Sequence, residues 1–280
     1  MPTLLRLLYA LLAGLIALPA AAQQTREDVV RIPASGASLV ATVMRPAGDD
    51  KRPLVVINHG SPPDAASRPT MLSPRFTAVS SWFVARGYVV VLPLRRGYGQ
   101  TGGAWAETYG SCEEPDYYSA GLESAADIEA AIAFMRRQPF VAAGRTLVVG
   151  ESAGGWATIA LSSLNPRGIA GMVNLAGGRG GHQELASGAI GNCRPAALVT
   201  AAGRYGATAR VPMLWIYAEN DSFFSPVLAR RMFGAYVAAG GHASLRLLAP
   251  LDVDGHLLVA NERTVATWSA ALADFLATLK

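Results

Sequence analysis

The sequence predicts an α/β fold, in which helices cover both faces of a mostly parallel β-sheet. Strand-like and helix-like stretches alternate along the chain, and most of the strand-like stretches are continuous apolar runs. Strands buried on both faces have this composition, because helices shield both sides of a parallel sheet from water. Hydrophobic residues make up 51% of the 280 residues and charged residues only 16%, which excludes a disordered chain, a collagen and a charged coiled coil.

Seven strands are expected where apolar runs are bounded by turn-forming residues. In chain order they span residues 38–44, 54–58, 88–92, 146–149, 169–174, 213–217 and 245–248. Helices are expected where apolar side chains recur every three or four residues and so share one face. Three such faces contain Phe76, Val79 and Phe83; Leu122, Ala125, Ile128, Ile132 and Met135; and Val265, Trp268, Leu272 and Phe275. Two further helices are expected to begin after Ser152 and at Pro226.

Residues 23–280 are expected to form one domain, because neither a repeat nor a linker divides them. A proline-rich stretch at 61–74 and a glycine-rich stretch at 177–191 each follow a strand. Loops this long within a domain are more often functional than idle. The formal net charge is only +4, and the basic residues are scattered, so nucleic acid is not expected as a partner.

Residues 1–22 have the layout of a secretory signal peptide. Arg6 precedes an apolar run from residue 7 to 18, and Ala20 and Ala22 are small residues at the expected cleavage site. An uncleaved membrane anchor is the alternative, but the run from 7 to 22 is shorter than the roughly 20 residues that span a bilayer. We therefore expect a periplasmic or secreted protein with no membrane anchor after cleavage.

Cys112 and Cys193 are the two cysteines of the chain. Exported proteins meet an oxidising compartment, where an isolated pair of cysteines tends to join. The sequence therefore predicts a disulfide between them. Two buried free thiols are the alternative.

The segment Gly150-Glu151-Ser152-Ala153-Gly154 matches the pattern G-x-S-x-G between an expected strand and an expected helix. A serine in this position occupies a tight, strained turn, and the flanking glycines leave room for the chain to pass itself. Its hydroxyl lies at a helix N-terminus, whose partial positive charge favours a developing oxyanion. Ser152 is therefore the candidate nucleophile.

A serine nucleophile needs a histidine base and a carboxylate that orients the histidine. Of the four histidines, His256 follows the last expected strand and is preferred as the base, with His182 as the alternative. Asp221 follows the strand at 213–217 and is preferred as the acid. Asp252 and Asp254 are alternative acids, although closeness in sequence does not place them at the histidine ring.

These motifs resemble the α/β-hydrolase superfamily, and within it the dienelactone-hydrolase-like and prolyl-oligopeptidase-like esterases. The chain order serine, aspartate, histidine agrees with that architecture. The residues that carry the resemblance are His59-Gly60, Arg96-Gly97-Tyr98-Gly99, Gly102-Gly103, the elbow at 150–155, Asn220-Asp221 and Gly255-His256. Dienelactone hydrolases proper have a cysteine nucleophile, so Ser152 departs from their pattern.

The resemblance implies an α/β-hydrolase fold with a mostly parallel eight-stranded sheet, helices on both faces and no large cap domain. It also implies an oxyanion hole formed by the backbone N–H groups of Ser61 and Ala153, because Pro62 and Pro63 have no N–H to donate. The strand order of the superfamily would place the disulfide at the rim of the substrate cleft. Candidate substrate contacts on these loops are His59, Arg96, Tyr98, Arg179 and His182.

The expected activity is the hydrolysis of a small carboxylic ester by a serine esterase, through an acyl-enzyme intermediate. Neither a cofactor nor a metal is expected, because no His-x-x-x-His or Cys-x-x-Cys spacing and no dinucleotide fingerprint occurs. A serine peptidase or amidase of the prolyl-oligopeptidase type is the alternative, since the same residues cut amides. A non-catalytic binding protein on the same fold is a further alternative.

Overall fold

The computed structural model describes residues 24–185 and 187–279 of the chain. The expected signal peptide at residues 1–22 lies outside the described residues. Within the described ranges, no helix combines the length and the apolar character that crossing a bilayer requires.

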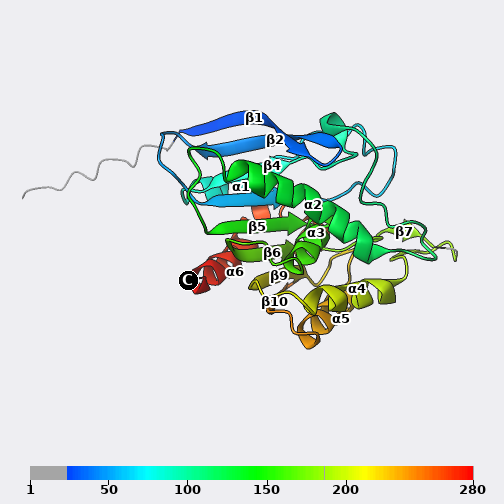
Figure 1. Cartoon of the computed structure of the whole chain (residues 1–280). Helices are drawn as coiled ribbons and strands as arrows, with labels where there is room; N and C mark the ends of the chain where they lie inside the picture. The colour runs from blue at the N-terminus through cyan, green and yellow to red at the C-terminus, as the bar shows by residue number, and fades with distance from the viewer. Residues whose placement is uncertain (1–23, 186, 280) are drawn as a thin grey trace, which may run out of the picture.

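Eight strands form one mixed sheet through the middle of the molecule (Figure 1). They span Thr25–Ala34 (β1), Ala37–Pro46 (β2), Leu54–Asn58 (β3), Val89–Pro93 (β4), Thr146–Glu151 (β5), Ile169–Leu175 (β6), Met213–Ala218 (β9) and Ala243–Leu248 (β10). Their order across the sheet is β1-β2-β4-β3-β5-β6-β9-β10. β2 is antiparallel to both of its neighbours, and all the other neighbouring pairs are parallel. The expected mostly parallel, eight-stranded sheet is confirmed.

Six helices cover the two faces of this sheet. They span Thr77–Val84 (α1), Tyr117–Met135 (α2), Ala153–Ser162 (α3), Pro195–Gly206 (α4), Pro226–Ala238 (α5) and Val265–Thr278 (α6). In Figure 1, α2 and α3 cross the near face, and α4 packs against α5 below them. α1 and α6 pack on each other, with the rings of Trp82 and Trp268 6.1 Å apart. Most side chains of the apolar faces predicted from the sequence are buried in this core, and Phe76, Leu122 and Val265 are half-buried against it.

Each strand expected from the sequence is present, and its ends differ by at most two residues from the expected range. The apolar runs do not reveal β1, because most of its side chains are exposed at the sheet edge and Ile32 is its one buried residue. They also miss α4, whose buried face contains two alanines and a glycine beside Leu198 and Tyr205. Two-residue strands at Gln183–Glu184 (β7) and Ile190–Gly191 (β8) pair within the glycine-rich stretch.

The sheet brings the functional loops to one edge. β3, β5, β6 and β9 are neighbours that run in the same direction, so their carboxyl ends meet. They end at Asn58, Glu151, Leu175 and Ala218. The loop that begins at residue 59, the turn at Ser152 and the loops after β6 and β9 therefore lie together.

Candidate active site

Ser152 lies in the sharp turn that joins β5 to α3. Its backbone has φ 53° and ψ −120°, a strained conformation that the surrounding structure must hold in place. The N–H of Ser152 donates to the carbonyl oxygen of Leu175 at 3.0 Å, which ties the turn to β6. A Cβ atom on Gly154 would lie 2.3 Å from the backbone oxygen of Asn58, so this close crossing requires glycine. The turn therefore has the geometry that the sequence motif predicts.

His256 reaches Ser152 from a short helical turn after β10. Its Nε2 atom lies 3.0 Å from the Ser152 hydroxyl oxygen, and both residues are less than a tenth exposed. The His256 ring stacks on the ring of Phe223, with centroids 4.0 Å apart and an angle of 16° between the planes. The backbone N–H of His256 donates to Asp254 at 2.9 Å. These contacts fix both the ring and the turn that carries it.

Asp221 faces the other side of the His256 ring. Its two carboxylate oxygens lie 3.2 and 3.3 Å from Nδ1 of His256, and its side chain is fully buried. The same carboxylate accepts the backbone N–H groups of Phe223 and Phe224 at 2.8 and 2.9 Å. Nδ1 of His256 therefore carries the proton, and Nε2 is left free to accept the proton of the Ser152 hydroxyl.

The alternative acids and the alternative base lie elsewhere. Asp254 accepts the hydroxyl and the backbone N–H of Ser222 and the backbone N–H of His256, so it holds the loop and makes no hydrogen bond to the His256 ring. Asp252 is exposed. His182 is also exposed, and its ring packs against Phe223 with centroids 4.6 Å apart. The structure thus brings together the serine, histidine and aspartate that the sequence favoured.

Several charges act on the imidazole of His256. Burial disfavours its protonated form, but the hydrogen bond and charge of Asp221, followed by the charges of Glu151 and Asp254, outweigh burial and raise its pKa above the ordinary 6.5. Glu151 comes directly before the serine, and its Oε1 lies 4.0 Å from Nε2 of His256. Burial raises the pKa of Glu151. Sequence reasoning did not single out this second carboxylate beside the imidazole.

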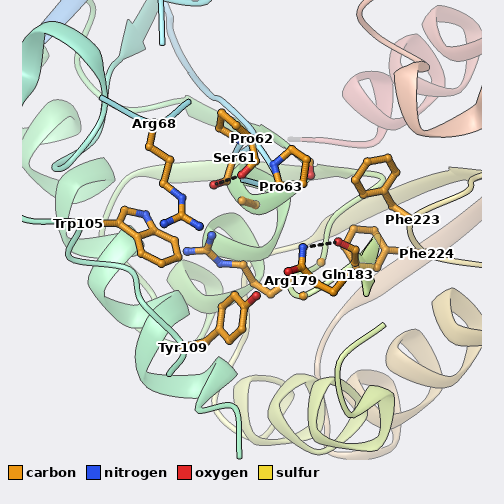
Figure 2. Close-up of a pocket in the computed structure, with 15 residues that line it drawn as sticks. Ser61, Pro62, Pro63, Arg68, Trp105, Tyr109, Arg179, Gln183, Phe223 and Phe224 are labelled. Carbon is orange, nitrogen blue, oxygen red and sulfur yellow. Dashed lines mark hydrogen bonds between the residues drawn. The ribbon is translucent and has the colours of Figure 1, made fainter. Parts of the chain in front are cut away.

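Two hollows meet at Ser152. The first is a narrow cavity of about 40 Å³, and Figure 2 shows the side chains around it. Its lining includes Ser61, Ala153, Arg68, Trp105 and Arg179. The second, of about 240 Å³, is lined by His256, Glu151, Phe223 and Phe76 among others. Because the expected oxyanion donors Ser61 and Ala153 both line the first hollow beside Ser152, that hollow is on the side where a carbonyl oxygen would be held.

The loop that carries Ser61 is supported by His59. The His59 ring is 1% exposed, with Nε2 accepting the backbone N–H of Arg95 at 3.1 Å and Nδ1 lying 2.6 Å from the carbonyl oxygen of Gly60. Burial, helped by the charge of Arg95, lowers the pKa of His59 to about 3, so the ring stays neutral. His59 therefore shapes the loop, and it also lines the larger hollow, so a contact between its side chain and substrate stays a prediction.

Two other expected substrate contacts are also framework residues. Tyr98 is fully buried, and its hydroxyl accepts the indole N–H of Trp105 at 3.0 Å. Arg96 is paired with Asp127 at 2.7 Å and with Glu123 at 3.1 Å on α2. Both side chains hold the loops: the partners of Arg96 come from helix α2, and the partner of Tyr98 is the nearby loop residue Trp105. Of the five expected contacts, Arg179 lines the narrow hollow.

A buried ion cluster lies directly behind the narrow hollow. The Glu107 carboxylate is paired with Arg95 at 3.1 Å and with Arg179 at 2.7 Å, and it also accepts the hydroxyl of Ser124. The three charged side chains are at most 3% exposed. Burial disfavours the ionised carboxylate, but Arg179 and Arg95 outweigh it and hold the pKa of Glu107 well below its usual range. The cluster fixes the position of Arg179 at the hollow.

The expected disulfide is present and lies near the same hollow. It joins Cys112, before α2, to Cys193, before α4, with Cα atoms 4.9 Å apart. The buried Cys193 donates its backbone N–H to the carbonyl oxygen of Gly180 at 2.8 Å, and its own carbonyl oxygen accepts the hydroxyl of Tyr117. Since Gly180 lines the narrow hollow, the disulfide ties one wall of it to α2 and α4.

The fold and the site together define a serine hydrolase of the α/β-hydrolase fold. Residues 35–202 match the family described as X-Pro dipeptidyl-peptidase (S15 family). The chain belongs to this family. No curated protein sequence matches it. Within the described residues, no large cap domain covers the site, in agreement with the expected architecture.

Solved structures share the fold at low sequence identity. A putative dienelactone hydrolase from Klebsiella pneumoniae superposes with a TM-score of 0.60 at 16% identity, covering 89% of this chain and 98% of that one. A Pyrococcus furiosus esterase gives 0.63 at 15% identity, covering 91% and 93%. The acylaminoacyl peptidase of Pyrococcus horikoshii gives 0.64 at 17% identity, but this chain spans only 42% of its length. These similarities show the fold.

Proposed function

We propose that this protein hydrolyses carboxylic esters of small acyl groups through an acyl-enzyme intermediate. The observation that carries the proposal is the hydrogen-bonded series from Ser152 through His256 to Asp221, placed where two hollows meet. A serine hydroxyl is a weak nucleophile at neutral pH, and this arrangement supplies the base that activates it. The buried Asp221 orients the base and stabilises its charged form.

In the proposed reaction, the oxygen of Ser152 attacks the ester carbonyl carbon while Nε2 of His256 takes the hydroxyl proton. The carbonyl oxygen becomes an oxyanion, which the N–H groups of Ser61 and Ala153 stabilise. When this intermediate collapses, the C–O bond to the alcohol breaks, and His256 returns the proton to the departing oxygen. A water molecule then attacks the acyl-enzyme by the same route and releases the acid and Ser152.

The second candidate function is peptide hydrolysis, which the name of the S15 family suggests. A dipeptidyl-peptidase must hold a substrate with a free, positively charged N-terminus on the acyl side of its serine. Here the narrow hollow on that side is lined by the guanidinium groups of Arg68 and Arg179. Like charges in a confined site repel, which disfavours an ammonium group there. Charge therefore supports the esterase over the dipeptidyl-peptidase.

Purified protein tests the two functions directly. We expect turnover of p-nitrophenyl acetate and of ethyl acetate, and covalent labelling by a fluorophosphonate probe. The Ser152→Ala variant should lose turnover and labelling, whereas Ser35→Ala, which removes an exposed hydroxyl of the turn between β1 and β2, should retain the label. Hydrolysis of glycyl-prolyl p-nitroanilide with a kcat/KM above that for ethyl acetate would instead establish the peptidase. Absence of labelling would favour a binding protein.

We also propose that the protein is exported. The layout of residues 1–22 and the pairing of both cysteines support an oxidising compartment. Mass spectrometry of the protein purified from the periplasm or culture medium should find a mature N-terminus close to Gln23. Recovery of the uncleaved chain in the reducing cytoplasm, with both thiols free, would contradict export.

A further inference from the structure

The two hollows at Ser152 have different roles in the proposed reaction. His256 must return its proton to the departing alcohol, so the larger hollow, which His256 lines, takes the leaving group. Ser61 lines both hollows, whereas Ala153 lines the narrow one and His256 the larger one, so the narrow hollow is the one left for the carbonyl oxygen and the acyl group. The side chains of the narrow hollow therefore select the acyl part of the substrate.

Two guanidinium groups are part of the wall of the narrow hollow. Arg68 comes from the proline-rich loop after β3 and Arg179 from the loop after β6, and Figure 2 shows both pointing toward Trp105. The Cζ atoms of Arg68 and Arg179 lie 3.4 and 5.7 Å from the centre of the Trp105 ring. Stacking on a tryptophan holds a guanidinium in place and leaves its edge open to a ligand.

The positive charge of this wall is only partly compensated. Glu107 is the one carboxylate paired with both Arg95 and Arg179, and within the described residues no carboxylate pairs with Arg68. The Nε atoms of Arg68 and Arg179 are buried and have no hydrogen-bond partner among the described residues. The Arg179 side chain is 3% exposed. These enclosed Nε atoms add to the cost of burying the two positive charges, and an anion bound in the hollow would offset that cost by its charge.

We propose that the narrow hollow binds a carboxylate carried by the acyl group, so that the enzyme prefers the monoesters of short dicarboxylic acids. This inference rests on the proposed esterase function and names its substrate class. A carboxylate offers two oxygens in a plane, which matches the donor geometry of a guanidinium and supplies the negative charge that the wall lacks. The small volume of the hollow, about 40 Å³, favours short acyl chains over long ones.

A matched pair of ligands measures what the negative charge of the ligand contributes to binding. Monoethyl succinate carries the carboxylate, and ethyl succinamate replaces it by a neutral amide of nearly the same shape. Calorimetric binding to the inert Ser152→Ala protein should show monoethyl succinate binding about 10- to 100-fold more tightly, as charge-assisted hydrogen bonds allow. The ratio should fall as salt is added, because ions screen the arginines.

Arg68 is the residue to vary, because removing Arg179 would leave Glu107 short of a partner inside the protein. Arg68→Gln in the Ser152→Ala background should reduce the binding ratio to within about threefold, whereas Arg68→Lys should keep an intermediate ratio. Arg31→Gln removes an exposed arginine on β1 and should leave the ratio unchanged. Circular dichroism checks that each variant is folded.

The outcomes separate this inference from the esterase proposal. Equal binding of the two ligands, binding of neither at millimolar concentration, or a preference that persists in folded Arg68→Gln overturns the anionic subsite. If the subsite is overturned but the wild-type enzyme cleaves ethyl acetate, the esterase proposal stands. If the preference is present but neither ethyl acetate nor monoethyl succinate is cleaved, the esterase proposal fails and the carboxylate site remains.

Discussion

Replacing Glu107 by glutamine should destabilise the fold strongly, although the change removes only a charge. The Glu107 carboxylate is 2% exposed and lies between Arg95 at 3.1 Å and Arg179 at 2.7 Å, with the hydroxyl of Ser124 also donating to it. Glutamine keeps the size of the side chain but turns one acceptor oxygen into an NH₂ donor. In Glu107→Gln, that donor would face guanidinium donors, and both arginines would lose their counter-charge.

The expected magnitude follows from this burial. Removing one partner of a buried ion pair costs about 3–5 kcal/mol of unfolding free energy, because the remaining charge is left without compensation. Glu107 serves two guanidiniums that are 1% and 3% exposed, so the loss should fall within or above that range. For a domain of this size, it corresponds to a melting temperature lower by roughly 6–20 °C.

Urea unfolding followed by circular dichroism measures this change in free energy. Glu123→Gln is the matched control, because Glu123 also pairs with an arginine, Arg96 at 3.1 Å, but is 54% exposed. An exposed pair contributes at most about 1 kcal/mol. If folded Glu107→Gln loses no more stability than Glu123→Gln, the cluster is not the compensated charge centre described above, and the reasoning is refuted.

Three further predictions concern the site and its frame. The kcat/KM for ethyl acetate should fall as pH drops through a pKa above 6.5, because protonated His256 cannot act as a base. Glu151→Gln should move this acidic limb of the pH profile to lower pH, because it removes a negative charge beside the imidazole. An acidic limb that does not move would contradict the role of the second carboxylate. The Cys112→Ser, Cys193→Ser double variant, whose loop spans 81 residues, should lose up to about 4 to 5 kcal/mol of unfolding free energy in urea, and unchanged stability would oppose the cross-link. Gly154→Ala should lower the free energy of unfolding by roughly 1–3 kcal/mol and should lower kcat/KM, because its Cβ would lie 2.3 Å from the backbone oxygen of Asn58. Wild-type values of both quantities would show that the turn adjusts to the added methyl group.

The sequence predicted the buried parallel strands best. Strand β3 has the expected bounds, and all of its side chains are buried, so its apolar run is uninterrupted. Edge strand β1 could not be predicted in the same way, because an edge strand needs few apolar residues and Ile32 alone is buried. Helix α4 was missed because its buried face is made partly of alanine and glycine, which carry little hydrophobic signal.

In the candidate site, too, some residues could be predicted from the sequence and others could not. Ser152, Asp221 and His256 each follow a strand, and the structure places them in hydrogen-bond contact. Arg68, Trp105 and Glu107 were missed, because no local pattern marks an isolated loop residue that acquires its neighbours through packing. Arg96 and Tyr98 were expected to contact substrate because the sequence does not show which partners they have in the fold. In the structure, both side chains support the loops.

The sequence by itself determined the layered fold, the edge of the sheet where the site lies and the three residue types that meet there. These depend on patterns within one segment, such as apolar period, turn residues and position after a strand. Only the tertiary structure decided which charges are compensated. Arg179 meets Glu107 and Arg68 meets Trp105 across long stretches of chain, and the burial and pairing of a charge depend on such distant neighbours.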